Sequence, residues 1–253
     1  AINVLDRTCN ELDFRYIHSK DFYAGIERAT KLFEEEYFGK LCGKPKNEEI
    51  SVIGHTHIDV AWLWTLAQTA EKAQRSFSTV INLMEQYPEY KFIQSSACHS
   101  DMLLKHYPSL FKRIQKSVAD GKYEPNGGVW VECDCNITSG ESMIRQFLWG
   151  QRFTRKHFGY TSDCFWLPDT FGYSAAIPQI MKGCSVDYFL TTKIDWNDVN
   201  HFPYDTFKWE GIDGTKVFTH FNSTAAWPSP RCFNEAVTGD VKHHRSINER
   251  NVT

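Results

Sequence analysis

The chain has 253 residues and a formal net charge of −3, and 42% of its residues are hydrophobic. This composition is typical of a globular protein with one large core or two small ones. The sequence contains no long basic run and no apolar stretch of about 18 residues, so we expect neither a nucleic acid nor a membrane to be its partner. Eight cysteines are spread along the chain, and we expect most of them to be buried, reduced thiols.

The first 40 residues are predicted to be helical, because apolar side chains recur at helical spacing within residues 21–38. A polar connector follows at residues 44–49. We therefore assign residues 1–49 to an N-terminal helical segment with its connector. Residues 50–253 are assigned to the N-terminal part of an α/β domain that is incomplete at its C-terminus.

From residue 50 onward, stretches typical of strands and of helices alternate. Predicted strands cover residues 50–54, 91–95, 128–132, 163–167 and 187–191, and a predicted hairpin covers residues 206–210 and 216–221. Predicted helices cover residues 65–86, 101–119 with a break at Pro108, 139–158 and 175–182. Such alternation is typical of a mostly parallel sheet, open or closed into a barrel. We predict an α/β fold with a distorted, barrel-like parallel sheet and helices outside it, preceded by the helical segment.

Polar side chains follow several of the predicted strands. In α/β folds the active site lies at the carboxyl ends of the strands. The groups found at these ends are His55 to Asp59, Glu132 to Asp134, Asp169, and Lys193 with Trp196. We therefore expect them to lie near one another at one edge of the sheet.

His57 and Asp59 have the spacing of a metal site. On an extended backbone, residues two apart point the same way, so these two side chains can converge on one ion, and His55 shares their direction. Zinc binds imidazole nitrogen and carboxylate oxygen at about 2.0–2.2 Å. The segment therefore indicates a metal site, with a His–Asp hydrogen bond without metal as the alternative.

Asp169 stands where the apolar run of residues 164–168 gives way to a turn. A carboxylate that binds a metal through one oxygen could attack a substrate with the other. The alternative is an aspartate that only caps the following turn. The aromatic residues on both sides favour the first interpretation, because a turn does not require them.

Other side chains could contact a ligand. Aromatic rings offer flat apolar faces on which a sugar ring can stack, although core packing is the alternative for each. A lysine could bind a ligand oxygen or anchor a carboxylate, and acidic groups could bind hydroxyls or fix the metal ligands; Glu132 is such a group. The candidates for substrate contacts are Trp62, Phe171, Lys193, Asp134 and Trp196.

Four segments resemble, in order and spacing, the α-mannosidases of glycoside hydrolase family 38. They are GHTHIDVAWLW (54–64), GGVWVECD (127–134), SGESMIRQFL (139–148) and FWLPDTFGYS (165–174). The similarity runs from about Ile50 to Phe221. The first and last segments are similar to the bacterial and cytosolic branch of the family.

The resemblance implies a zinc-dependent α-mannosidase that cleaves mannosides or oligomannose, as in N-glycan degradation, and a cytoplasmic location. It implies that zinc is bound by His57, Asp59 and Asp169, and that Asp169 is also the nucleophile of a retaining mechanism. Such a mechanism needs a second carboxyl about 5–5.5 Å from the nucleophile. The residues that the resemblance places around the bound mannose are Trp62, Phe171 and, by a looser match, Lys193.

The sequence departs from the family in one respect. The acid/base aspartate of the family lies in a glycine-rich segment, and its fourth zinc ligand is a histidine further on; these 253 residues contain neither motif. We therefore interpret the chain as the N-terminal catalytic portion of a longer protein. We predict that this portion alone is a poor mannosidase and a weak zinc binder.

Two other interpretations stay open. In an amidohydrolase-type site, His55 and His57 would both bind a metal whose bound water attacks the substrate. That interpretation needs further histidines at later strand ends and leaves residues 165–172 unexplained. The second alternative is a non-catalytic carbohydrate-binding protein on the same fold. The sequence also leaves open whether the protein is a homo-oligomer.

Overall fold

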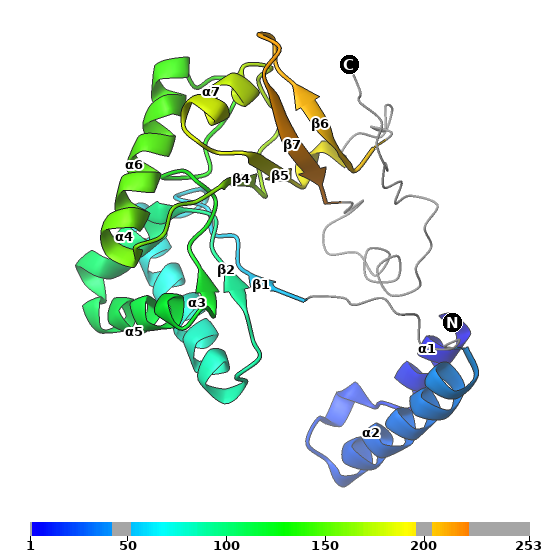
Figure 1. Ribbon diagram of the computed structural model, residues 1–253. Helices are drawn as coiled ribbons and strands as arrows, with labels where there is room; N and C mark the ends of the chain where they lie inside the picture. Colours follow the sequence, from blue (N-terminus) through cyan, green and yellow to red (C-terminus); the bar gives the residue numbers. More distant parts are fainter. Residues whose placement is uncertain (1, 42–51, 196–203, 223–253) are drawn as a thin grey trace. The chain divides into compact units, whose positions relative to one another are not determined.

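The computed structural model describes residues 2–41, 52–195 and 204–222 of the chain, which belong to two compact units, Ala1–Ser51 and Val52–Thr253. The first unit contains helices α1 (Ile2–Asn10) and α2 (Lys20–Phe33), and a π-helical segment, Glu34–Leu41, follows α2 (Figure 1). Ser19 caps α2 by accepting the N–H of Phe22. Helices thus occupy the segment whose periodicity predicts them.

The second unit contains two sheets. In the first, β1 (Gly54–His55), β2 (Phe92–Ile93) and β3 (Tyr123–Glu124) are parallel and lie in this order. The second sheet has the order β4 (Cys164–Leu167), β5 (Tyr188–Thr191), β7 (Lys216–Phe221), β6 (Thr206–Glu210), with β6 antiparallel to β7. Parallel bridges between Ser96 and Val129 and between Gly127 and Phe165 continue the pairing from the first sheet to the second.

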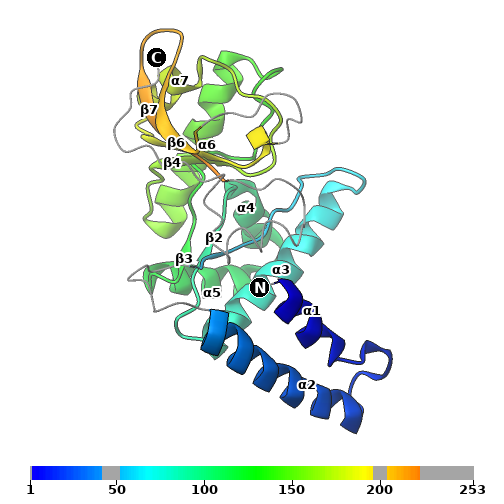
Figure 2. The same ribbon diagram turned by 90° about the vertical axis from the view of Figure 1, so that its right-hand side faces the viewer.

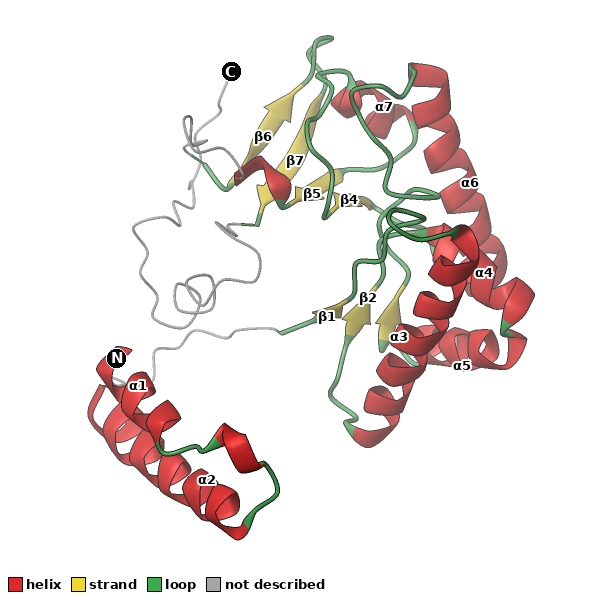
Figure 3. Cartoon of the chain, turned by 180° about the vertical axis from the view of Figure 1, so that it is seen from behind, coloured by secondary structure: helices red, strands yellow, loops and turns green. Residues whose placement is uncertain are grey.

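Five helices pack beside these sheets. They are α3 (Leu66–Gln86), α4 (Ala97–His106), α5 (Pro108–Ala119), α6 (Gly140–Phe158) and α7 (Ile177–Gly183). Helices α4, α5 and α6 lie along one side of the strands (Figure 3). The hairpin β6–β7 and α7 lie at one end of this unit, and α3 and α5 lie at the other (Figure 2). In the described part of the chain, no helix is long and apolar enough to cross a bilayer.

Two hydrophobic cores anchor the ends of the strands. In the first, the rings of Phe92 and Tyr123 lie 5.3 Å apart and pack against Phe77 of α3. In the second, Phe165 of β4 and Phe189 of β5 lie 5.6 Å apart. Burial of each such side chain stabilises the folded state by about 1.5–3 kcal/mol. Large apolar side chains therefore hold the strands in place.

Most predicted elements are confirmed because their signals are local. Thr65 and Gln68 form a capping box at the start of α3, and six apolar residues of this helix are buried. Ser139 caps α6, and Gly159 ends it in the left-handed conformation with φ of 65°. The helix predicted to break at Pro108 is two helices, α4 and α5. The hairpin has the predicted bounds.

Two strand predictions are wrong. Residues 128–132 form no strand, because Gly127 and Gly128 have φ of 121° and 77° and turn the chain out of extended geometry. Val52 and Ile53 are exposed and outside β1, whereas the sequence predicts a buried strand there; Ile50 and Ser51 lie outside the described residues. The parallel α/β class is confirmed, but the described strands form open sheets and do not close into a barrel.

Gly150 allows α6 to approach the loop that follows β3. A Cβ atom at this position would lie 2.4 Å from the carbonyl carbon of Val129. Gly150→Ala is therefore expected to lower the free energy of unfolding by about 1–3 kcal/mol through overpacking. The measurement is denaturant unfolding. Gly140→Ala on the same helix is the matched control, since a Cβ there meets nothing within 4 Å; equal losses in both variants would contradict the close approach.

His99 is a buried, neutral histidine. Burial lowers the pKa of its imidazole to about 4, and the amide of Gln94 donates to its Nδ1, which protonation would prevent. Because the unfolded histidine has a pKa near 6.5, unfolding takes up a proton below that pH. The contribution of His99 to the free energy of unfolding is therefore fully present above a pH of about 6.5. It falls by at most about 3 kcal/mol as the pH approaches 4.

The variant His99→Gln tests this pH dependence. It is expected to show a flatter decline in the free energy of unfolding between pH of about 6.5 and 4 than the wild type. Urea unfolding at several pH values measures both slopes. Parallel curves for the two proteins would contradict the assignment of a neutral, buried His99.

Candidate active site

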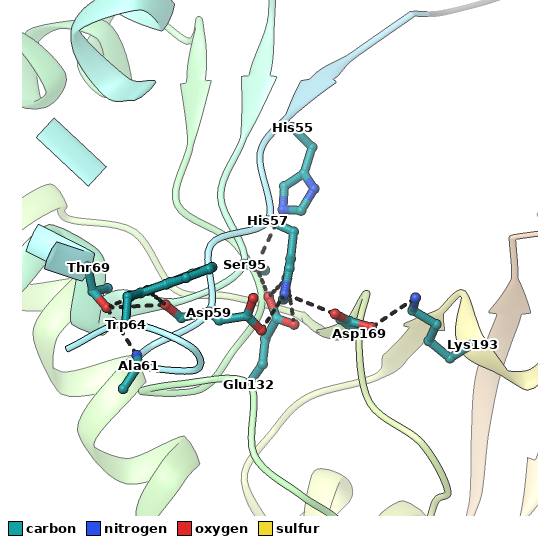
Figure 4. Close-up of polar contacts among 10 residues, drawn as sticks. All are labelled: His55, His57, Asp59, Ala61, Trp64, Thr69, Ser95, Glu132, Asp169 and Lys193. Carbon is teal, nitrogen blue, oxygen red and sulfur yellow. Dashed lines mark hydrogen bonds and ion pairs between the residues drawn. The ribbon is translucent and has the colours of Figure 1, made fainter. Parts of the chain in front are cut away.

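Three side chains that can bind a metal ion converge at the carboxyl ends of β1 and β4. His57 and Asp59 follow β1, and Asp169 follows β4 (Figure 4). The Nε2 atom of His57 lies 3.2 Å from Oδ1 of Asp59 and 3.2 Å from Oδ2 of Asp169. One candidate ligand atom from each of the three residues lies within 4.8 Å of the others. The sequence expectation that these segments meet is confirmed.

The donor set fits a divalent metal ion. One imidazole nitrogen and two carboxylate oxygens are ligands that zinc accepts, and the distances among them allow one ion to contact all three. Burial alone would lower the pKa of the His57 imidazole, but the carboxylates of Glu132, Asp59 and Asp169 outweigh it and raise the pKa to about 9. The site thus favours a positive charge, which the imidazolium supplies in the absence of metal.

Lys193 holds the other side of Asp169. Its Nζ atom lies 3.0 Å from Oδ1 of Asp169, and its side chain is 10% exposed. The ammonium group also lies 5.3 Å from the ring centre of Phe171. Asp169 therefore lies between two nitrogen atoms, Nε2 of His57 near one oxygen and Nζ of Lys193 near the other. This contact agrees with the expectation that Lys193 anchors a carboxylate.

The structure places the remaining candidates differently. Trp62 and Phe171 are 67% and 58% exposed, so neither ring is packed into a core and both can meet a ligand. Asp134 accepts the backbone N–H groups of Asn136 and Ile137 through Oδ1. Its side chain caps a turn and forms no hydrogen bond or ion pair with the three converging residues, all of which the structure describes. Trp196 lies outside the described residues.

His55 is separate from the candidate metal ligands. Its Nε2 lies 3.4 Å from Oγ of Ser95, and its ring packs 4.2 Å from the ring of Trp166. Burial, followed by the charge of His57, lowers its pKa to about 4. Since the amidohydrolase interpretation requires His55 and His57 to bind one metal, this arrangement disfavours it.

Sequence reasoning missed Ser95 and the contacts that join it to the site. Its hydroxyl donates to Glu132 at 2.8 Å, and the carboxylate of Glu132 lies 3.1 Å from Nδ1 of His57. Ser95 follows β2 as the other site residues follow their strands, and this position was the one signal in the sequence that could have identified it. A lone serine in a polar segment carries no chemical pattern of its own.

Comparison with known proteins identifies the family of this segment. Residues 47–252 match the model for the glycosyl hydrolases family 38 N-terminal domain. The chain is 45% identical over 219 residues to alpha-mannosidase G of Dictyostelium discoideum, covering 87% of this chain and 19% of that protein. It is 49% identical over 185 residues to alpha-mannosidase 2C1 of Homo sapiens, covering 73% and 18%. The chain thus spans about a fifth of the length of these relatives.

A solved structure agrees with the fold. The crystal structure of an alpha-mannosidase from Enterococcus faecalis V583 superposes with a TM-score of 0.65 at 24% identity. The superposition covers 77% of this chain and 23% of that protein. At this identity the likeness concerns the fold alone.

Zinc is expected to stabilise the protein through His57. A ligand that binds only the folded state adds about 2.7 kcal/mol of stability at a concentration of 100 times its Kd. Addition of zinc to the metal-free full-length protein should therefore raise its Tm, and His57→Ala should remove this shift. The control is His106→Ala, which changes an exposed histidine of α4. An undiminished zinc shift in His57→Ala would contradict the assignment.

Proposed function

Because the chain belongs to glycosyl hydrolase family 38, we propose that it forms part of a zinc-dependent α-mannosidase that cleaves α-linked mannosides with retention of configuration. The convergence of His57, Asp59 and Asp169 within 4.8 Å carries the proposal. The relatives in which this segment recurs at 45% and 49% identity are named alpha-mannosidases. In this proposal residues 50–253 form the N-terminal part of the catalytic domain, whose sheet is barrel-like in the complete protein.

His57, Asp59 and Asp169 would hold the zinc ion in this enzyme. When bound, zinc supplies a positive charge that binds sugar hydroxyls and helps to distort the mannose ring. The side chain of Asp169 is well placed for a second task, since Lys193 holds its Oδ1 atom at 3.0 Å, while its Oδ2 atom faces the other candidate ligands, 3.2 Å from Nε2 of His57. Such fixation reduces the motion needed to reach the anomeric carbon.

The reaction proceeds in two displacements. A carboxylate oxygen of Asp169 attacks the anomeric carbon of mannose, the glycosidic C–O bond breaks, and the leaving oxygen takes a proton from a second carboxylic acid. Water then attacks the same carbon, gives a proton to that carboxylate, and releases mannose and free Asp169. We assign none of the described carboxylates to the acid/base role. Two inversions at one carbon give net retention.

The proposed sugar contacts are the residues that the sequence indicates as candidates. We assign the rings of Trp62 and Phe171 to stacking on the mannose, and Lys193, Asp134 and Trp196 to its surroundings. Phe171 is tied to the turn of residues 134–136, because the amide of Asn136 donates to its carbonyl oxygen at 2.9 Å. The proposed substrates are α-mannosides, including oligomannose from N-glycan degradation. We propose a cytoplasmic location, supported by the similarity to the cytosolic branch.

Asp169→Asn tests the nucleophile. Release of p-nitrophenol from its α-mannoside by the full-length protein is expected to fall at least about a thousandfold in kcat, because an amide cannot form the glycosyl ester. The matched control is Asp187→Asn, which changes an exposed aspartate paired with Lys182. Activity that survives in Asp169→Asn would show that another group is the nucleophile. A wild-type protein that binds zinc and mannose without turnover would favour the carbohydrate-binding alternative.

A further inference from the structure

Glu132 links His57 to the neighbouring strand ends. Its side chain is 9% exposed, and its carboxylate lies 3.1 Å from Nδ1 of His57. The hydroxyl of Ser95 donates to the same carboxylate at 2.8 Å, and Nε2 of His55 lies 3.4 Å from that hydroxyl. Figure 4 shows Ser95 and Glu132 close to the ring of His57. Glu132 and Ser95 come from the segments that follow β3 and β2, and His55 comes from β1 itself.

We propose that Glu132, held in place by Ser95, is a positioning residue that fixes the tautomer and orientation of His57 and thereby sets the affinity of the site for its metal ion. This inference rests on the proposed function for the metal site itself. It adds residues that make no metal contact, since the candidate ligands within the described residues are His57, Asp59 and Asp169.

The tautomer follows from the chemistry of the contact. An ionised carboxylate only accepts hydrogen bonds, so the proton of a neutral His57 lies on Nδ1, where Glu132 accepts it. The lone pair of the imidazole then lies on Nε2, the atom that is 3.2 Å from both Asp59 and Asp169. A carboxylate behind a metal-binding histidine also raises the basicity of the ligand nitrogen. Glu132 therefore prepares the one nitrogen that faces the other ligands.

Ser95 restrains Glu132 because its own backbone is fixed. The residue is 1% exposed, and a Cβ atom at Gly127 would lie 2.0 Å from its carbonyl oxygen. The adjacent residue, Ser96, forms a parallel bridge with Val129. Close packing against residues 127–129 fixes the backbone from which the Ser95 hydroxyl reaches Glu132. The glutamate thus has one donor from Ser95, in the segment that follows β2, and one from the candidate metal ligand His57.

The affinity of the site for zinc distinguishes a residue that positions His57 from a residue that only stabilises the fold. The Kd for zinc is measured on the full-length protein by competition with a chelating dye, together with the Tm of each metal-free variant. Glu132→Gln is expected to weaken zinc binding by about 10- to 100-fold, and Ser95→Ala by a smaller factor in the same direction. A residue that only supports the fold would lower the metal-free Tm without this change in Kd.

Glu124→Gln is the matched control. Glu124 also ends a strand, β3, but its carboxylate accepts from Asn126 and Tyr160 rather than from the metal site. The substitution Glu124→Gln is expected to leave the Kd for zinc within about twofold of the wild-type value. The competition measurement distinguishes this from a 10-fold change, which corresponds to about 1.4 kcal/mol. His57→Ala is included as the variant that removes a ligand.

The outcomes distinguish the two levels of the proposal. An unchanged Kd in Glu132→Gln, with zinc binding lost in His57→Ala, overturns the positioning role and leaves the metal site standing. Zinc binding that persists in His57→Ala shows instead that the metal site of the proposed function is wrong. If Glu132→Gln does not fold, Ser95→Ala decides, and a wild-type Kd in that variant overturns the inference.

Discussion

The central constraint in this molecule is that three carboxylates lie around the imidazole of His57. Asp59, Asp169 and Glu132 all lie within 3.2 Å of a ring nitrogen of His57. Like charges at such short range disfavour one another unless a positive charge lies between them. Despite burial, the same carboxylates raise the pKa of the His57 imidazole to about 9, because they stabilise its protonated, positively charged form. A divalent cation at Nε2 would meet the same need with more charge.

The fold supplies this constraint by joining two sheets. His57 and Glu132 follow strands of the first sheet, whereas Asp169 and Lys193 follow strands of the second. The bridge between Gly127 and Phe165 is where the pairing passes from one sheet to the other. The relative position of the histidine and the proposed nucleophile therefore depends on the close packing around that glycine. Packing of large aromatic side chains behind β2, β4 and β5 keeps both strand sets in place.

The extent to which the sequence predicts this structure follows from the range of each interaction. The caps at Thr65, Ser139 and Gly159 and the His57–Asp59 pair are local patterns, and the structure confirms their geometry. The contact from Glu132 to His57 spans 75 positions, so the sequence predicts Glu132 near the site but not which ligand it contacts. The false strand at residues 128–132 has an apolar pattern like that of a real one. Two glycines with positive φ decide against it, and their conformation depends on tertiary packing.

The most direct test of the central claim is the identity of the atoms around bound zinc, measured by X-ray absorption at the zinc edge of the full-length protein. The account predicts a first shell of nitrogen and oxygen at about 2.0–2.2 Å, with the outer-shell signature of imidazole. Sulfur at about 2.3 Å would instead place the ion on thiolates. Cys133 and Cys135, which flank Asp134, would then be the first residues to consider. That result would contradict a site built on His57, Asp59 and Asp169.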